Sequence, residues 1–419
     1  MLSFLNNAWA LLLGVMLLMI GNGLQGTLLG VRGSIEGFST FEMSVVMSAY
    51  FLGFLFASRV VPKMIRNVGH VRVFAALASF ISAVLILYPA LANPWVWAVG
   101  RVIIGFCFCG VYITAESWLN AAATNETRGK ALSLYMLVQV VGIVIAQGLL
   151  LVADPGGFIL FVIPSILVSI AVAPILLAAS PTPAFDSTKP MSLKRLWEAS
   201  PLGCMGMFLL GGVFAAQFGM SAVYGGKAGL TLPQISAFVA SFYVGAILLQ
   251  FPIGWVSDRM DRRLLILVVA AGGGLASVLG AFAGANFSFL LLAAAIIGGT
   301  SNPLYSLLIA YTNDYLSRDD MAGASGGLLF INGLGAIAGP IIIGWSMDAF
   351  GARGYFLLMA VLLGLLVAYA AWRMTRRPAP SVQDTGAFAP LSPTSSLVAV
   401  ELAQEYSQES TEQDRDEPR

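Results

Sequence analysis

The sequence predicts an all-α membrane protein in which twelve transmembrane helices form two six-helix bundles. Hydrophobic residues make up 58% of the 419 residues and charged residues only 10%, well below the ~25% that is usual for soluble domains. Apolar runs long enough to cross a bilayer recur along almost the whole chain. Related segments also recur at an interval of about 192 residues, which indicates an internal duplication.

Twelve apolar segments are candidates for these helices. In the first half they are 8–31, 39–61, 71–91, 95–119, 130–152 and 158–179, and in the second half 201–224, 233–257, 263–284, 286–311, 321–347 and 352–374. The segment 286–311 contains the run Gly298 to Pro303, which we expect to interrupt its helix next to a cavity or other helices that satisfy the freed backbone groups.

The duplication is visible in matched polar residues. Gln25 lies in an apolar run of the first half, and Gln217 lies in the matching run of the second half. Ser39-x-x-Glu42 precedes one helix and Thr231-x-x-Gln234 precedes its counterpart, and both have the pattern of a capping box. Because an amide replaces the carboxylate in the second copy, helix capping is a better interpretation of Glu42 than proton binding.

The basic residues are distributed unevenly between the two sets of connections. Of the 22 Lys and Arg residues, 16 lie in alternate connections or beside the membrane ends of those connections. The opposite set holds only Arg32, Lys227 and Arg353. Since positive residues concentrate on the cytoplasmic side, both termini are expected to be cytoplasmic, as an even number of spans requires.

These patterns divide the chain into four parts. We expect an N-terminal six-helix bundle in 1–179, a cytoplasmic linker with a short interfacial helix in 180–200, and a C-terminal six-helix bundle in 201–377. Residues 378–419 are rich in Pro, Ser, Thr, Gln and acids, so this cytoplasmic tail is expected to be disordered. It is either a regulatory or protein-binding segment or a solvated extension without a specific role.

Several motifs carry a family resemblance. The run Gly254-Trp-Val-Ser-Asp258-Arg259-Met-Asp261-Arg262-Arg263 resembles the loop signature Gly-x-x-x-Asp-Arg-x-Gly-Arg-Arg of the major facilitator superfamily, with Asp261 where glycine is usual. Arg101-x-x-x-Gly105 is similar to its intramembrane arginine motif, and Gly335-x-x-x-Gly339-Pro340 to its glycine-proline motif. Within the superfamily, Glu116-Ser-Trp-Leu-Asn120 followed by Arg128-Gly129 resembles the YcaD-like bacterial carriers.

This resemblance implies the major facilitator fold and a secondary transporter that moves a small organic solute across the bacterial inner membrane by alternating access. Proton-coupled efflux is one form of this activity, although no acid is evident at mid-membrane depth. The expected carrier is a monomer whose partners are its solute and the lipid bilayer, with no cofactor, no metal and no nucleic acid.

Two alternatives from other classes remain. One is a membrane sensor that does not transport and signals through the acidic tail. The other is an intramembrane enzyme, which would need acids, histidines or an activated serine at membrane depth. The single histidine, His70, lies in a loop and no metal-ligand spacing occurs, so we do not expect an enzyme.

The loop signature suggests a gate made of ion pairs. Asp258 can accept hydrogen bonds from the amides at a neighbouring helix N-terminus, and Arg259 can pair with Asp314. In the first half Glu116 has three candidate partners, Arg66, Arg72 and Arg128. The alternative is that these bases only mark the cytoplasmic side. The residues assigned to the gate are Asp258, Arg259, Arg262, Arg263, Glu116, Arg128, Asp314 and Arg72.

The candidate substrate site lies deeper in the membrane. Arg101 follows an interfacial Trp95 and Trp97 by a turn or two, and an intramembrane charge usually faces a cavity or a partner. It either binds an anionic solute or braces helices. In the resembling family the first, fourth, seventh and tenth helices surround the cavity, where each polar side chain either contacts solute or joins helices. The residues assigned to this site are Arg101, Gln25, Gln217, Tyr112, Tyr305, Asn302 and Asn22.

Overall fold

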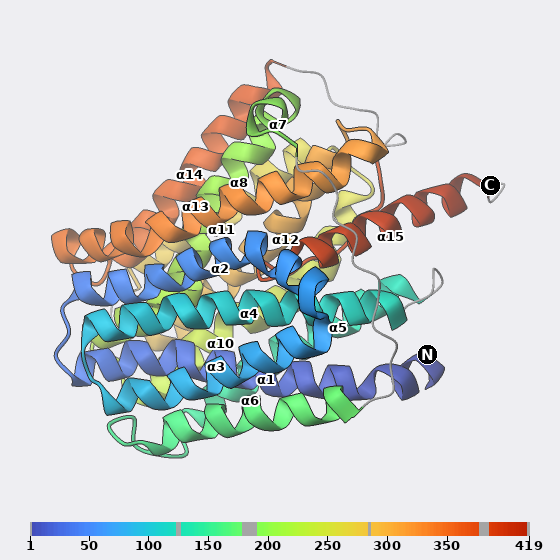
Figure 1. Cartoon of the computed structure of the whole chain (residues 1–419). Helices are drawn as coiled ribbons and strands as arrows, with labels where there is room; N and C mark the ends of the chain where they lie inside the picture. The colour runs from blue at the N-terminus through green and yellow to red at the C-terminus, as the bar shows by residue number, and fades with distance from the viewer. Residues whose placement is uncertain (1, 123–126, 178–190, 284–285, 377–384, 417–419) are drawn as a thin grey trace.

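The computed structural model describes residues 2–122, 127–177, 191–283, 286–376 and 385–416 (Figure 1). Within these ranges the regular structure is entirely helical. Eleven of the described helices are long and apolar enough to cross a membrane, and the apolar stretch Ile159–Pro174 provides a shorter twelfth. The predicted all-α membrane fold is therefore confirmed.

The first half contains six helices that match the first six predicted segments. Their ends differ from the predicted ones by a few residues, and the largest extensions are at both ends of the first helix and at the C-terminal end of the second. They are α1 (Leu2–Ile35), α2 (Thr40–Val68), α3 (His70–Ala90), α4 (Pro94–Ala122), α5 (Arg128–Leu149) and α6 (Ile159–Leu177).

The second half begins after a short helix, α7 (Leu193–Ala199), which lies where the sequence predicted an interfacial helix in the linker. Its first span consists of α8 (Pro201–Ala215), the π-helical turn η1 (Ala216–Met220) and α9 (Ser221–Lys227). The other spans are α10 (Leu232–Ser257), α11 (Arg262–Ala281), α12 (Phe287–Asn313), α13 (Arg318–Phe350) and α14 (Gly354–Met374). π-Helical turns are rare, and those that occur are often found at functional sites. The turn η1 contains Gln217.

The expected interruption of the tenth span does not occur. Helix α12 is continuous from Phe287 to Asn313 and includes Pro303. A Cβ atom on Gly298 would overlap the backbone of α10, and one on Gly299 would lie 2.6 Å from a Leu249 side-chain carbon. The glycines therefore allow two helices to approach closely, which is their usual use between membrane helices, and they do not break α12.

The same glycine contact recurs in both halves. Gly53 of α2 and Gly105 of α4 each lie so close to the other helix that a Cβ would overlap a backbone oxygen. Gly245 of α10 and Gly298 of α12 make the equivalent contact in the second half. The duplication inferred from matched residues thus extends to the way in which the helices pack.

Both predicted capping boxes are present. The Ser39 amide donates to Glu42 Oε2 at 2.8 Å, and the Glu42 amide donates to Ser39 Oγ at 3.2 Å. The Thr231 amide donates to Gln234 Oε1 at 2.9 Å, and this second cap also forms a complete capping box. Glu42 therefore caps α2, as the comparison of the two copies predicted.

The two halves are joined by direct contacts toward one end of the bundle, here called the Asp348 end. There Lys227 Nζ lies 2.5 Å from Asp348 Oδ1 and donates to Thr40 Oγ1 of the first half at 3.2 Å. Deeper in the bundle, Ser48 Oγ donates to the Ile337 carbonyl and Ser236 Oγ to that of Gln147, each at 2.5 Å. The opposite end, here called the Asp258 end, carries both chain ends (Figure 1).

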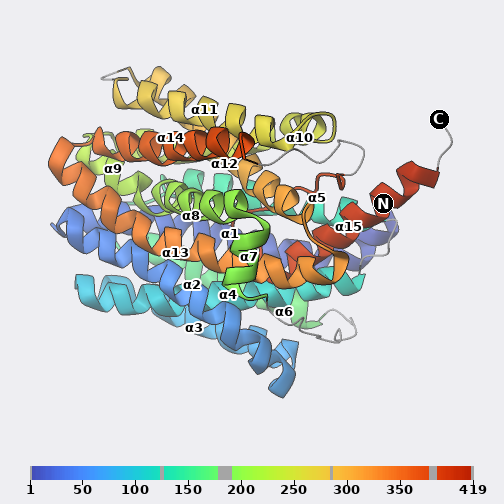
Figure 2. The ribbon, with the colours of Figure 1, turned by 90° about the horizontal axis from the view of Figure 1, so that it is seen from above.

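The C-terminal segment differs from the expected disordered tail. Residues 385–396 run into helix α15 (Leu397–Asp416), which packs against α4 and α5 of the first half and α13 of the second. Figures 1 and 2 show α15 emerging from the bundle at the Asp258 end. Leu391, Val400 and Leu402 are buried. The sequence did not predict this burial, because the average composition of residues 378–419 is polar and these apolar residues are few. Residues 377–384 and 417–419 lie outside the described part.

Candidate functional site

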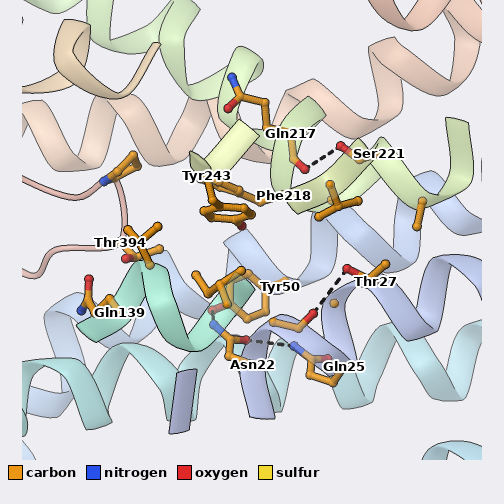
Figure 3. A pocket seen from close by; sticks show the side chains of 18 of the residues that line it. Asn22, Gln25, Thr27, Tyr50, Gln139, Gln217, Phe218, Ser221, Tyr243 and Thr394 are labelled. Atoms are coloured by element: carbon orange, nitrogen blue, oxygen red, sulfur yellow. Dashed lines mark hydrogen bonds between the residues drawn. The ribbon is translucent and has the colours of Figure 1, made fainter. Parts of the chain in front are cut away.

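A polar cavity of about 90 Å³ lies between the two halves. Figure 3 shows Asn22, Gln25 and Tyr50 on one wall, and Gln217, Phe218 and Tyr243 on the facing wall. Among the described residues, those that line the cavity include no acid. The polar side chains of the lining are Asn22, Gln25, Thr27, Tyr50, Arg101, Gln139, Gln147, Gln217, Ser221, Tyr243, Asn302, Ser392 and Thr394.

Arg101 provides the positive charge of the cavity. Its side chain is buried, and its Nη1 donates to Gln25 Oε1 at 2.9 Å. The guanidinium carbon lies 4.5 Å from the ring centroid of Tyr50, which is a favourable cation–π distance. Its Nε has no hydrogen-bond partner within the described ranges. Arg101 is therefore held by an amide and an aromatic face, and its charge is not neutralised by a carboxylate of the cavity wall.

A chain of amides orients Gln25 toward Arg101. Gln25 Nε2 donates to Asn22 Oδ1 at 3.0 Å, and Asn22 Nδ2 donates to the Tyr112 hydroxyl at 2.8 Å. Asn22 and Gln25 line the cavity, as predicted. Tyr112 is not among the lining residues, so its place is behind Asn22, where its hydroxyl positions the amide.

Gln217 lies on the wall that faces Gln25, so the cavity brings together the glutamine pair that the duplication singled out. Its Nε2 donates to Ser301 Oγ at 2.8 Å, whereas its Oε1 has no partner in the described part of the chain. Next to it, the Phe218 ring stacks on Tyr243 with 5.6 Å between centroids. The wall formed by η1 thus offers a free acceptor beside an aromatic surface.

The two predicted residues of α12 are placed differently from each other. Asn302 lines the central cavity, and its Nδ2 donates to the Gly298 carbonyl at 3.0 Å. Tyr305 is buried against Phe214, with 5.9 Å between ring centroids, and borders a separate cavity of about 70 Å³. Asn302 therefore belongs to the lining of the central cavity, whereas Tyr305 does not.

Several further residues of the lining, among them Tyr50, Thr27 and Ser221, were not assigned to the site from the sequence. Tyr50 supplies the ring below the Arg101 guanidinium, and Thr27 and Ser221 line the cavity from α1 and α9. Their only sequence signal is a polar group inside an apolar span. Many such residues join helices, so the pattern alone does not distinguish them.

The predicted ion pairs at the Asp258 end form with changed partners. Asp314 Oδ1 lies 2.6 Å from Arg262 Nη1, whereas Asp258 lies 3.7 Å from the same guanidinium. The predicted pair of Arg259 with Asp314 is wrong, because Arg259 turns back onto its own helix, donating to the Trp255 carbonyl and stacking 4.1 Å from its ring centroid. Burial raises the pKa of Asp314, and the Arg262 charge opposes that shift.

Asp261 explains a departure from the loop signature. Its Oδ1 accepts the Arg263 amide at 2.9 Å and caps α11, and its Oδ2 lies 2.8 Å from Arg263 Nη2. Burial alone would raise the pKa of Asp261, but the hydrogen bonds from Arg263 hold it below its ordinary value. A carboxylate at this position therefore stabilises the start of a helix and fixes a neighbouring base.

Glu116 is fully buried within α4 and does not sit at an exposed membrane edge. It accepts a hydrogen bond from the Tyr135 hydroxyl at 3.0 Å and another from the Ser396 amide, also at 3.0 Å. Arg72, one of its predicted partners, is exposed, and the side chain of Arg128 lies outside the described part. Among the described groups, Tyr135 of α5 and Ser396 of the C-terminal segment therefore supply hydrogen bonds to Glu116.

Comparison with known proteins decides the family. The model of the Major Facilitator Superfamily matches residues 11–231 and 203–404, which together span nearly the whole helical part. The chain belongs to the major facilitator superfamily. This protein is therefore a multi-pass membrane transporter and not an enzyme.

The transporter is similar to the MFS-type transporter YcaD. It is 27% identical to that of Escherichia coli strain 536 over 356 residues, which cover 84% of this chain and 91% of the relative. The protein of the same name from Escherichia fergusonii is 24% identical over 379 residues, covering 89% and 97%. The resemblance to YcaD-like carriers seen in the sequence motifs is thereby confirmed.

Solved structures show the same fold. The nucleoside transporter NupG aligns with a TM-score of 0.71 at 15% identity, covering 89% of this chain and 100% of that one. A bacterial homologue of the human lysosomal transporter Spinster, in an inward-facing and occupied conformation, aligns with a TM-score of 0.70 at 15% identity, covering 90% and 98%. At this identity the likeness concerns the architecture of the transporter alone.

Proposed function

We propose that the transporter carries a small organic solute with an anionic group, bound in the central cavity beside Arg101. The observation that carries this proposal is a buried guanidinium whose Nε has no partner, in a cavity that no acid of the described chain lines. An intramembrane cation is costly, and an anion in the cavity would offset that cost by charge-assisted hydrogen bonds.

The facing walls suggest that the solute also carries hydrogen-bond donors. Gln217 Oε1 and Gln147 Oε1 are buried acceptors without partners in the described chain. Both residues line the cavity, and buried acceptors of this kind are normally satisfied. A hydroxyl or amino group on the solute would satisfy them, so a hydroxy- or amino-substituted carboxylate fits the arrangement better than an aliphatic acid.

Transport would follow alternating access between the two halves. The hydrogen bond from Lys227 to Thr40 across the halves supports a state that is closed at the Asp348 end, and we propose that Asp258, Arg262 and Asp314 take part in closing the other end. We propose that this transport is coupled to protons, with Glu116, a buried carboxylate inside a span, as the supporting observation. The cavity between the two halves favours this transporter over a sensor without transport.

We further propose that the Asp258 end faces the cytoplasm of a bacterial inner membrane, with both chain ends on that side, as the distribution of basic residues indicates. An impermeant maleimide added to intact cells is expected to label Arg353→Cys but not Arg259→Cys. Both native side chains are exposed, which makes them a matched pair. Position 262 would be unsuitable because its side chain is buried. Strong external labelling at position 259 and none at position 353 would show that the orientation is opposite to the proposed one.

The solute class can be tested by thermal unfolding of the purified transporter. Hydroxy- and amino-carboxylates are compared with their neutral primary amides, which keep the shape and remove the charge. A carboxylate that binds the folded state is expected to raise the melting temperature, because ligand at about 100 times Kd stabilises the protein by ~2.7 kcal/mol. The matched amide is expected to have little effect. Equal stabilisation by the amides would contradict the anionic class.

A further inference from the structure

The described C-terminal segment, residues 385–407, enters the opening between the halves at the Asp258 end. It binds the second half through backbone groups. The Phe388 amide donates to Asp258 Oδ1 at 2.7 Å, and the Leu391 amide donates to Ser306 Oγ at 2.9 Å. Arg262, the partner of Asp314, also donates to the Gly386 carbonyl. Residues of the proposed gate thus hold the tail.

The same segment binds the first half at a buried carboxylate. The Ser396 amide donates to Glu116 Oε2 at 3.0 Å, and the Ser396 hydroxyl donates to the same oxygen. Further along α15, Gln404 Nε2 donates to Ser325 Oγ at 2.7 Å and to Asn313 Oδ1 at 3.2 Å. Because Glu116 belongs to one half and Asn313 and Ser325 to the other, the tail bridges the halves.

Two glycines of the bundle provide space for aromatic rings of the tail. A Cβ on Gly254 would lie 2.6 Å from a ring carbon of Phe388, and a Cβ on Gly129 would overlap the ring of Tyr406. Gly254 is the first residue of the loop signature, and Gly129 is at the start of α5. The contact is therefore fitted in shape as well as in hydrogen bonding.

The turn that precedes α15 reaches the central cavity. Ser392, Pro393 and Thr394 line it, and Figure 3 shows Thr394 at the edge of the cavity. Ser392 also lines a larger hollow of about 630 Å³ between α5 and α10, which adjoins the cavity at Asn302. The turn thus lies between the solute-binding walls and the Asp258 end.

We propose that residues 385–407 form a removable plug, which covers the central cavity from the Asp258 end and holds the two halves apart there. The surface that receives it consists of Glu116, Ser306, Asp258, the Arg262–Asp314 pair and the Asn313–Ser325 edge. While the plug is in place, the halves cannot close at this end, since α15 occupies the space between α4 and α13. The plug also slows solute exchange, and this consequence rests on the proposed transport function. That the plug covers the cavity does not depend on transport.

The test measures access to the cavity with a chemical probe and so requires no substrate. Thr27, a buried residue of the cavity lining, is replaced by Cys in a protein whose Cys107, Cys109 and Cys204 are replaced by Ala. Membrane vesicles are prepared with the Asp258 end facing the medium, and the rate of labelling by a charged, impermeant maleimide is measured. The rate is compared for the full chain, for a chain that lacks residues 385–419 and for point variants.

Ser396→Asp is expected to expel the plug, because it places a second carboxylate against Glu116. The labelling rate should rise about tenfold or more, since losing a hydrogen bond to a charged group shifts a two-state equilibrium by roughly a decade. Combining it with Glu116→Gln removes the repulsion and should return the rate toward that of the full chain. Ser395→Ala is the matched control, because Ser395 Oγ accepts from the amide of Ser392 within the tail itself.

Deletion of residues 385–419 should give at least the rate of Ser396→Asp. An unchanged labelling rate in both variants would overturn the plug, whatever their melting temperatures. A rate that rises equally in Ser395→Ala would also overturn it, since loosening of the turn would then explain the access. If the deletion protein does not fold, the labelling rates of Ser396→Asp and of its combination with Glu116→Gln still test the plug. The carboxylate and amide titrations above test the transport proposal separately.

Discussion

Arg101→Gln is expected to abolish binding of an anionic solute while the transporter still folds. The change removes the only positive charge of the cavity lining in the described chain and keeps a polar side chain of moderate length. A hydrogen bond to a charged group contributes ~1.5–3 kcal/mol, and the loss of a bidentate pair should weaken binding by at least about a hundredfold. Titration of the stabilising carboxylate, read beside the melting temperature without ligand, measures the effect.

Two further variants separate solute contact from bracing. Arg101→Lys keeps the charge but loses the planar fork, so it should bind more weakly than the native protein and better than Arg101→Gln. Arg59→Gln is the matched control, because Arg59 also stacks on an aromatic ring, 4.5 Å from the centroid of Phe330, but does not line the cavity. Unchanged affinity in Arg101→Gln with a lowered melting temperature would leave Arg101 as a brace between helices.

Gly105→Ala is expected to cause a large loss of stability for a single added methyl group. Its Cβ would overlap the carbonyl oxygen of Tyr50, so α2 and α4 would have to move apart along their whole contact. Overpacking usually costs ~1–3 kcal/mol, and more where backbone cannot yield. Since Tyr50 also stacks on Arg101, the separation would distort the cavity wall. We expect little folded protein in size-exclusion chromatography and a strongly lowered melting temperature.

The control for this prediction is Gly364→Ala in α14. Gly364 is also inside a membrane helix, but a Cβ there has no heavy atom within 4 Å. The methyl group should be neutral or slightly stabilising, because alanine has the higher helix propensity. If Gly105→Ala and Gly364→Ala gave the same melting temperature, the close contact of α2 and α4 would not be needed for the fold.

The architecture was predictable because it follows from local patterns. The length and apolarity of each segment determine whether it can cross a bilayer, and the capping boxes at Ser39 and Thr231 depend on residues three positions apart. The duplication was equally visible, because matched polar residues such as Gln25 and Gln217 recur at one interval. Family membership followed from motifs that are contiguous in the chain.

The site was predictable in part. Arg101, Asn22, Gln25, Gln217 and Asn302 all line one cavity, because an isolated polar group inside a span must face either a cavity or another helix. The same rule does not distinguish those two cases. Tyr112 and Tyr305 were therefore selected although they lie behind the lining, and Tyr50 and Ser221 were missed.

What the sequence by itself determined is thus the set of spanning helices, their caps, their duplication and the family. Only the tertiary structure decided the partners across the bundle, because those depend on which side chains meet when helices far apart in the chain pack together. Arg262, not Arg259, reaches Asp314, and Glu116 meets Ser396, 280 residues away. The tail shows the same limit, since its apolar residues become buried only against a surface that exists after both halves have folded.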